Sequence, residues 1–191
     1  MNVLDFCLKI ENAIPDEICD DLIRIFDESE QKSRMDRNGY PNWTNLFISE
    51  LVHDEKELIQ NKIEEQNWHI LRAYQEYLGE YGKYFVSDKN CFKFEQANIK
   101  CYVGGTDDRY DLHADVSTLL TSKRYLGMIW YLNDDFTGGK TTFFPDCSLQ
   151  PKKGSVLVFP PYWMFPHSGE PVIEGKKYIM STYCEWSDGQ D

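Results

Sequence analysis

Basic residues and histidine are scarce in this sequence. It carries 20 Lys and Arg against 32 Asp and Glu, so its formal net charge is −12, and it has only 4 His. The negative electrostatic field of such a chain disfavours non-specific binding to nucleic acid or to an anionic membrane surface. We therefore expect neither a nucleic acid nor a membrane as a partner, whereas a neutral or basic peptide or a small molecule is compatible with the charge.

Long apolar runs and paired cysteines are also absent. No apolar run reaches the roughly 20 residues that span a bilayer, and the N-terminus lacks the basic and apolar regions of a signal peptide. The 6 cysteines form no C-x-x-C pair, which disfavours a zinc knuckle or a thioredoxin-like site. We therefore expect free thiols, a reducing compartment and a cytoplasmic location.

What is present is enough material for one folded domain. The chain has 191 residues, 41% of them hydrophobic and 15% aromatic, without internal repeats or low-complexity stretches. We expect a single domain over residues 1–191. Residues 1–90 should supply mostly helical support and a lid loop, and residues 91–186 a strand-rich catalytic core.

The N-terminal part is predicted to contain a short strand, two helices and a loop. We expect the strand at residues 3–10 and a helix that begins at Pro15 and runs to about residue 27. Residues 31–45 are rich in turn formers and read as a loop, which is a candidate substrate lid. Apolar and aromatic residues at helical spacing predict a long helix over about residues 54–81, with a stripe that packs against a sheet.

The C-terminal part changes to the pattern of strands. Short β-branched or aromatic runs are bounded by Gly, Pro and Asp. Helices followed by a run of strands indicate an α+β domain, in which a barrel or sandwich is backed by the N-terminal helices. The runs are 96–102, 125–132, 141–144, 155–159 and 177–185.

The chemistry is concentrated at His113-Ala114-Asp115 and at a distant histidine, His167. In a strand, residues i and i+2 point to one face, so His113 and Asp115 could converge on one metal ion. Two histidines and one carboxylate are the ligand set that holds non-haem Fe(II) and leaves coordination positions open for chemistry.

A series of motifs surrounds these residues in a specific order. Over about residues 96–186 this order resembles the prolyl 4-hydroxylase-like branch of the Fe(II)/2-oxoglutarate-dependent dioxygenases. The motifs are Tyr102-x-Gly-Gly, Tyr110-x-x-His113-x-Asp115, Arg124, Tyr131-Leu-Asn, Gly138-Gly-Lys-Thr-x-Phe143, Pro151-Lys-Lys-Gly-Ser-x-x-x-Phe159, His167-x-Gly-x-Pro-Val172 and Gly175-x-Lys177.

The resemblance implies a fold, a reaction and a metal site. The fold is a double-stranded β-helix (jelly roll, cupin-like), and His113, Asp115 and His167 match the iron ligands at its mouth. The implied cofactors are Fe(II), the cosubstrate 2-oxoglutarate and O2, with ascorbate as a further candidate. The implied reaction is hydroxylation of a C–H bond, with a prolyl residue of a protein or peptide as the favoured substrate.

The resemblance also implies how the cosubstrate is held. Lys177, ten positions after His167, matches the residue that pairs with the distal carboxylate of 2-oxoglutarate, and Tyr131 matches a hydrogen-bond donor to it. Tyr102 matches a position near the cosubstrate and the metal. Ser181 and Tyr183 share the strand face of Lys177 and are candidates to line the same pocket.

Other functions remain open from the sequence. The same scaffold could act on a free amino acid, another small molecule or a nucleobase, although the acidic charge counts against nucleic acid. It could also be a non-catalytic module that binds a metal only structurally, which the presence of Lys177 beside the three ligand residues disfavours. The oligomeric state is not predicted.

Overall fold

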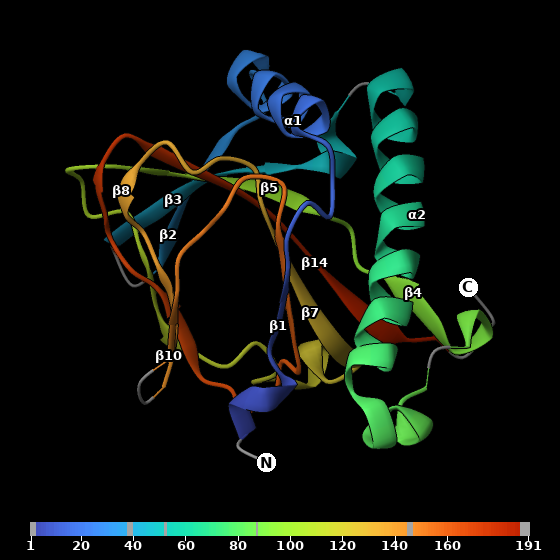
Figure 1. Cartoon of the computed structure of the whole chain (residues 1–191). Helices are drawn as coiled ribbons and strands as arrows, with labels where there is room; N and C mark the ends of the chain where they lie inside the picture. The colour runs from blue at the N-terminus through green and yellow to red at the C-terminus, as the bar shows by residue number, and fades with distance from the viewer. Residues whose placement is uncertain (1–2, 38–39, 52, 87, 145–146, 188–191) are drawn as a thin grey trace.

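The computed structural model describes residues 3–37, 40–51, 53–86, 88–144 and 147–187, and its centre is a sandwich of antiparallel sheets (Figure 1). The major sheet has the strand order β1-β11-β7-β14-β5-β3-β2, with β4 paired to β14. Its strands are β1 (Leu8–Ile10), β2 (Ser33–Arg37), β3 (Tyr40–Phe47), β4 (Phe92–Phe94), β5 (Asn98–Val103), β7 (Arg124–Tyr131), β11 (Val156–Phe159) and β14 (Lys176–Trp186).

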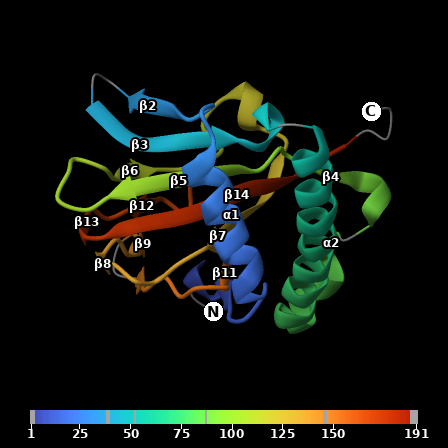
Figure 2. The same ribbon diagram turned by 90° about the horizontal axis from the view of Figure 1, so that it is seen from above.

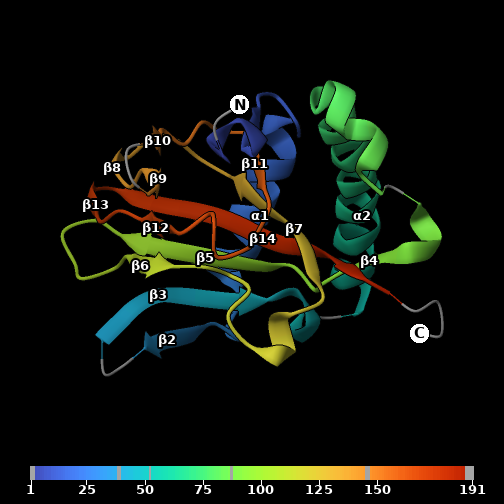
Figure 3. The same cartoon turned by 90° about the horizontal axis from the view of Figure 1, so that it is seen from below.

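A smaller sheet of order β10-β9-β12-β6 covers the inner face of the major sheet, and β13 and β8 form a separate pair. Figure 3, seen from below, shows β6 and β12 side by side, next to the long strands β5 and β14. The strands are β6 (Tyr110–His113), β9 (Thr141–Phe143), β10 (Cys147–Leu149), β12 (His167–Gly169), β8 (Thr137–Gly138) and β13 (Val172–Glu174). The two facing sheets confirm the predicted jelly roll.

Strand alternation divides the core into two clusters. On β7, Met128 and Trp130 face the helices, whereas Tyr131 belongs to the cluster between the sheets. On β14, Met180 faces the helices and Ile179 faces the smaller sheet. Because successive side chains of a strand point to opposite faces, one sheet supports both layers. Each large side chain buried in this way contributes about 1.5–3 kcal/mol.

Two helices cover the outer face of the major sheet (Figures 1 and 2). Helix α1 (Asp16–Glu28) begins after Pro15 and buries one stripe, at Cys19, Leu22 and Phe26. Spacings of three and four residues put these side chains on one face of the helix, whose position the sequence predicted. Helix α2 (His53–Tyr77) buries a second stripe against the sheet.

The predicted end of the long helix was wrong by one turn. Helix α2 ends at Tyr77, and a 3-10 helix follows at Gly79–Tyr84. Gly79 has a φ of +54°, the left-handed conformation in which glycine commonly ends helices. The predicted stripe is therefore buried at Tyr74 but not at Tyr77 and Tyr81, which are 47% and 50% exposed.

Two further N-terminal predictions were wrong. Most of residues 31–45 form strands instead of a loop, because β2 pairs with β3 and β3 pairs with β5; residues 38 and 39 of this segment lie outside the described residues. Trp43 and Leu46 are buried on opposite faces of β3, and the turn-forming residues beside them had hidden this alternation. The predicted strand at 3–10 is a 3-10 turn, Val3–Phe6, before the short β1.

Three short 3-10 helices complete the elements, at Ile48–Glu50, Lys89–Cys91 and Leu119–Thr121. Among the described residues, no helix combines the length and the apolar character that crossing a membrane would need.

Candidate functional site

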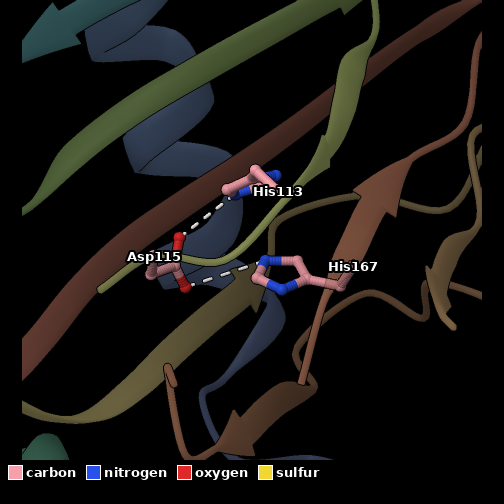
Figure 4. A group of neighbouring side chains, drawn as sticks. All are labelled: His113, Asp115 and His167. Carbon is pink, nitrogen blue, oxygen red and sulfur yellow. Dashed lines mark hydrogen bonds and ion pairs between the residues drawn. The ribbon is translucent and has the colours of Figure 1, made fainter. Parts of the chain in front are cut away.

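His113, Asp115 and His167 converge in the space between the two sheets (Figure 4). His113 is the last residue of β6 and pairs directly with His167, the first residue of β12, so their ring centroids lie 4.4 Å apart. The Asp115 carboxylate faces both rings, with Oδ1 at 3.1 Å from Nε2 of His113 and Oδ2 at 3.7 Å from Nε2 of His167. One ligand atom from each residue lies within 4.8 Å of the others.

His113 and Asp115 converge as predicted, but a bend brings them together instead of the alternation of one strand. Strand β6 ends at His113, and Asp115 lies in a bend rather than two residues further along a strand. The bend is fixed where the backbone N–H of Val116 donates to the carbonyl of Pro161 at 2.9 Å. Asp115 is therefore turned back toward the cross-strand histidine pair instead of continuing along the sheet.

Both histidines present Nε2 toward the carboxylate. His113 Nδ1 lies 2.8 Å from the carbonyl oxygen of Asp111, and His167 Nδ1 lies 3.1 Å from that of Phe165. A carbonyl accepts only, so Nδ1 carries the hydrogen and Nε2 keeps its lone pair in the neutral ring. Such outer hydrogen bonds are how proteins orient histidine ligands of metals.

The electrostatics of the three residues match a cation site. Burial raises the pKa of Asp115, but its hydrogen bond to His113 and the neighbouring histidines outweigh burial, so the pKa falls below its usual value. Burial is also the main reason why the pKa of His167 is lowered. Asp115 Oδ2 is buried without a hydrogen-bond partner. An ionised carboxylate whose Oδ2 lacks a hydrogen-bond partner, beside two imidazoles that present Nε2, fits a divalent transition metal.

Lys177 lies on β14 and is only 3% exposed, which excludes a surface position. Its Nζ donates to the carbonyl of Gly139 at 2.6 Å and lies 5.7 Å from the ring centroids of both Tyr102 and Tyr131. Burial lowers the pKa of Lys177 to about 7, although the charge of Glu170 acts in the opposite direction. A buried ammonium whose hydrogen-bond partner is a neutral carbonyl is well suited to receive an anion.

One pocket connects Lys177 with the three converging residues, and Tyr102, Ser181 and Tyr183 line it as the sequence analysis expected. We call it the inner cavity. Its walls are Lys100, Tyr102, Tyr110, His113, Asp115, Ile129, Thr141, His167, Ser168, Gly169, Lys177, Ile179, Ser181 and Tyr183.

Tyr131 is fully buried behind this wall rather than part of it. Its hydroxyl donates to Oγ1 of Thr141 at 2.8 Å, and Thr141 lines the cavity. Thr141 was not predicted as a site residue, although it stands inside the Gly138-Gly-Lys-Thr motif. Lys100 was not predicted either, because a lone lysine in a strand carries no signal of which face it occupies.

A second, more open cavity of about 420 Å³ adjoins the inner one and shares Lys100, Tyr110, His113 and Asp115 with it. We call it the outer cavity. Aromatic rings form one wall, where Trp43 stacks on Tyr110 with centroids 4.6 Å apart. Ser181 and Tyr183 line both cavities as well, and the other lining residues are Met35, Asn45, Phe47, Glu95, Gln96, Asn98, Ala114, Ser117, Thr121 and Arg124.

Comparison with known proteins shows which family this arrangement is similar to. Residues 97–185 match the sequence model of the 2OG-Fe(II) oxygenase superfamily. This segment contains the two histidines, the aspartate and the two lysines of the inner cavity. Over these residues the chain is similar to the enzymes of this superfamily, which depend on Fe(II), 2-oxoglutarate and O2.

Solved structures share the fold over almost the whole chain. A viral collagen prolyl hydroxylase from Paramecium Bursaria Chlorella virus-1, in a 2-oxoglutarate complex, has a TM-score of 0.68 at 23% identity, covering 96% of this chain and 97% of that one. A Pseudomonas putida prolyl-4-hydroxylase has a TM-score of 0.63 at 15% identity, with coverages of 94% and 91%.

A prolyl hydroxylase from Trichoplax adhaerens, solved with a peptide fragment of hypoxia inducible factor, has a TM-score of 0.68 at 15% identity. The match covers 95% of this chain and 84% of that one. No curated protein matches the sequence.

Proposed function

We propose that this enzyme hydroxylates a prolyl residue in a peptide or protein. The observation that carries the proposal is the order of groups along the two joined cavities. A buried ammonium lies at the inner end, three metal-type ligands lie in the middle, and an aromatic wall opens outward. This order suits a dianionic cosubstrate on one side of a metal and a ring-shaped substrate on the other.

In this proposal His113, Asp115 and His167 are the iron ligands. Iron and 2-oxoglutarate, when bound, would activate O2, one atom of which enters a substrate C–H bond while the other enters succinate, with release of CO2. The outer hydrogen bonds of the two histidines fix the ring orientations, and Asp115 supplies the single anionic ligand. Three ligands on one side leave the remaining positions to cosubstrate and O2.

Lys177 would bind the distal carboxylate of 2-oxoglutarate. Its ammonium needs an anion to offset the cost of burial, and charge-assisted hydrogen bonds are strongest where water is excluded. Thr141 and Tyr102 supply further hydroxyl groups to the inner cavity, and Tyr131 holds Thr141 in place through their hydrogen bond. These residues position the cosubstrate and keep water away from its inner end.

Two observations support a prolyl substrate. Trp43 and Tyr110 stack on each other beside the ligand residues and form an aromatic wall against which a pyrrolidine ring can pack. The fold is also that of the prolyl hydroxylases named above, one of which was solved with a peptide. The outer cavity is open enough to accept a residue within a longer chain.

The test is a mass-spectrometric screen for the gain of one oxygen across peptides with and without proline. We expect iron- and 2-oxoglutarate-dependent oxygen gain only in proline-containing peptides. The variant Asp115→Ala should abolish it, whereas Asp111→Ala, at an exposed neighbouring position, should retain it. Turnover of 2-oxoglutarate coupled only to other substrates would refute the prolyl assignment. Full activity of Asp115→Ala would refute the ligand assignment.

A further inference from the structure

Lys100 is a second lysine that reaches the site, from the middle of strand β5. It pairs with Ile179 of β14 on one side and with Asn45 of β3 on the other. It shares a strand face with Tyr102, so its side chain points between the sheets and lines both cavities. Its charge is close enough to act on the pKa of His167.

The ammonium of Lys100 has no polar partner among the described residues. Its contacts are with two rings, since Nζ lies 5.5 Å from the centroid of Trp43 and 5.3 Å from that of Tyr110. Burial lowers the pKa of Lys100 to about 8, although Asp115 raises it. Lys100 is half-buried, and contact with aromatic rings offsets only part of the cost of this partial burial.

The other charged side chains of the outer cavity already have partners. Arg124 donates to both oxygens of Glu95, at 2.6 and 2.8 Å, so this pair is neutral. Asp115 faces His113 and His167. With a divalent metal on that carboxylate, Lys100 becomes the uncompensated charge of the outer cavity, in a protein whose net charge is −12.

We propose that Lys100 binds a carboxylate of the substrate, so that the enzyme selects prolyl sites with an acidic group next to the reacting residue. This inference rests on the proposed function and adds the substrate class. The carboxylate belongs to the substrate rather than to 2-oxoglutarate because Trp43, one of the two rings beside Nζ, lines the outer cavity and is not part of the inner wall. Elsewhere the acidic surface would repel such a substrate, so a local cation is needed.

The carboxylate could come from an acidic side chain or from the free α-carboxylate of an amino acid. Matched pairs separate the two sources and isolate the charge. Peptides with Glu or Gln, and with Asp or Asn, on either side of proline differ only in charge, as do free proline and prolinamide. A charge-assisted hydrogen bond in a partly buried site corresponds to a preference of about 10- to 100-fold in kcat/KM for the acid.

The variant Lys100→Met should remove this preference by raising the KM for the acidic member of a pair to that of its amide. Lys100→Glu should reverse the preference, so that peptides with Lys next to proline have a higher kcat/KM than peptides with an acidic residue there. The matched control is Lys89→Met, which also removes an ammonium over an indole ring, with Nζ 5.0 Å from Trp68, but on the helical side. That control should keep the wild-type preference for the acid.

Three results would overturn the inference. The wild type could treat acids and amides alike, Lys100→Met could lower kcat/KM equally for both, or the variant could weaken binding of 2-oxoglutarate rather than of the peptide. Anaerobic calorimetry with metal and 2-oxoglutarate present measures peptide binding without turnover. Lys100-dependent binding of acidic peptides that are never hydroxylated would refute the prolyl reaction and leave the role of Lys100 intact.

Discussion

Replacing Lys177 by methionine should make the ligand-free protein more stable. The fold lowers the pKa of Lys177 from 10.5 to about 7, mainly through burial. Each pKa unit corresponds to about 1.4 kcal/mol, so carrying this ammonium costs the fold about 4–5 kcal/mol near pH 7. Methionine has a similar shape without the charge, but it leaves the Gly139 carbonyl unpaired, which costs about 1–3 kcal/mol. The net gain should be about 1–4 kcal/mol.

The pH dependence of this gain tests its cause. Below about pH 7, Lys177 is protonated in both the folded and the unfolded state, and the folded protein carries the full cost of the buried ammonium. Between about pH 7 and pH 10 only the unfolded state keeps the proton, so this cost shrinks as pH rises. The advantage of Lys177→Met over the wild type should therefore fall by about 1.4 kcal/mol per pH unit in that window. The contributions of other groups that titrate in this window are the same in both proteins, so they cancel in the difference between the two free energies of unfolding.

The assay is urea unfolding of metal-free protein without 2-oxoglutarate, followed by tryptophan fluorescence from about pH 6 to about pH 9. Lys176→Met is the matched control, because the neighbouring lysine is exposed on the opposite strand face and should change stability by less than about 0.5 kcal/mol. Equal stabilities and equal pH profiles of the two variants would refute the burial of an uncompensated charge at Lys177.

Three further outcomes follow from the same contacts. The Kd of 2-oxoglutarate, measured by calorimetry, should rise with pH above about 7, by up to tenfold per unit, because binding selects the protonated Lys177. Gly139→Ala should lower the free energy of unfolding by about 1–3 kcal/mol, because φ is +62° and a Cβ would lie 2.9 Å from Phe136; wild-type stability would contradict this. Asp108→Asn should cost about 3–5 kcal/mol, because the fully buried carboxylate pairs with Arg34 and accepts from the Val103 N–H; an unchanged thermal midpoint would show that the pair is dispensable.

The sequence predicted the site better than it predicted the scaffold around the site. His113, Asp115 and His167 could be selected because few residue types bind a metal ion. Lys177 could be selected because it stands ten positions after His167, the spacing that the resemblance implies. The hairpin of β2 and β3 was not predicted, because its strands are defined by pairing with β5 and not by their own composition. Lys100 was missed for the same reason, since only the register of β5 shows that its side chain points inward.

Register is therefore the property on which this site depends. Strand β14 places Lys177, Ser181 and Tyr183 on one face, from the closed end of the inner cavity to the outer one. A slip of one residue would turn this face outward and bring Lys176 inward two positions before Tyr178. Gly175 precedes β14 and has a φ of +85°, and a Cβ at this position would lie only 3.1 Å from the Asp135 carbonyl oxygen. This glycine sets where β14 begins. A turn that only glycine makes readily thus fixes which of two adjacent lysines faces the metal ligands.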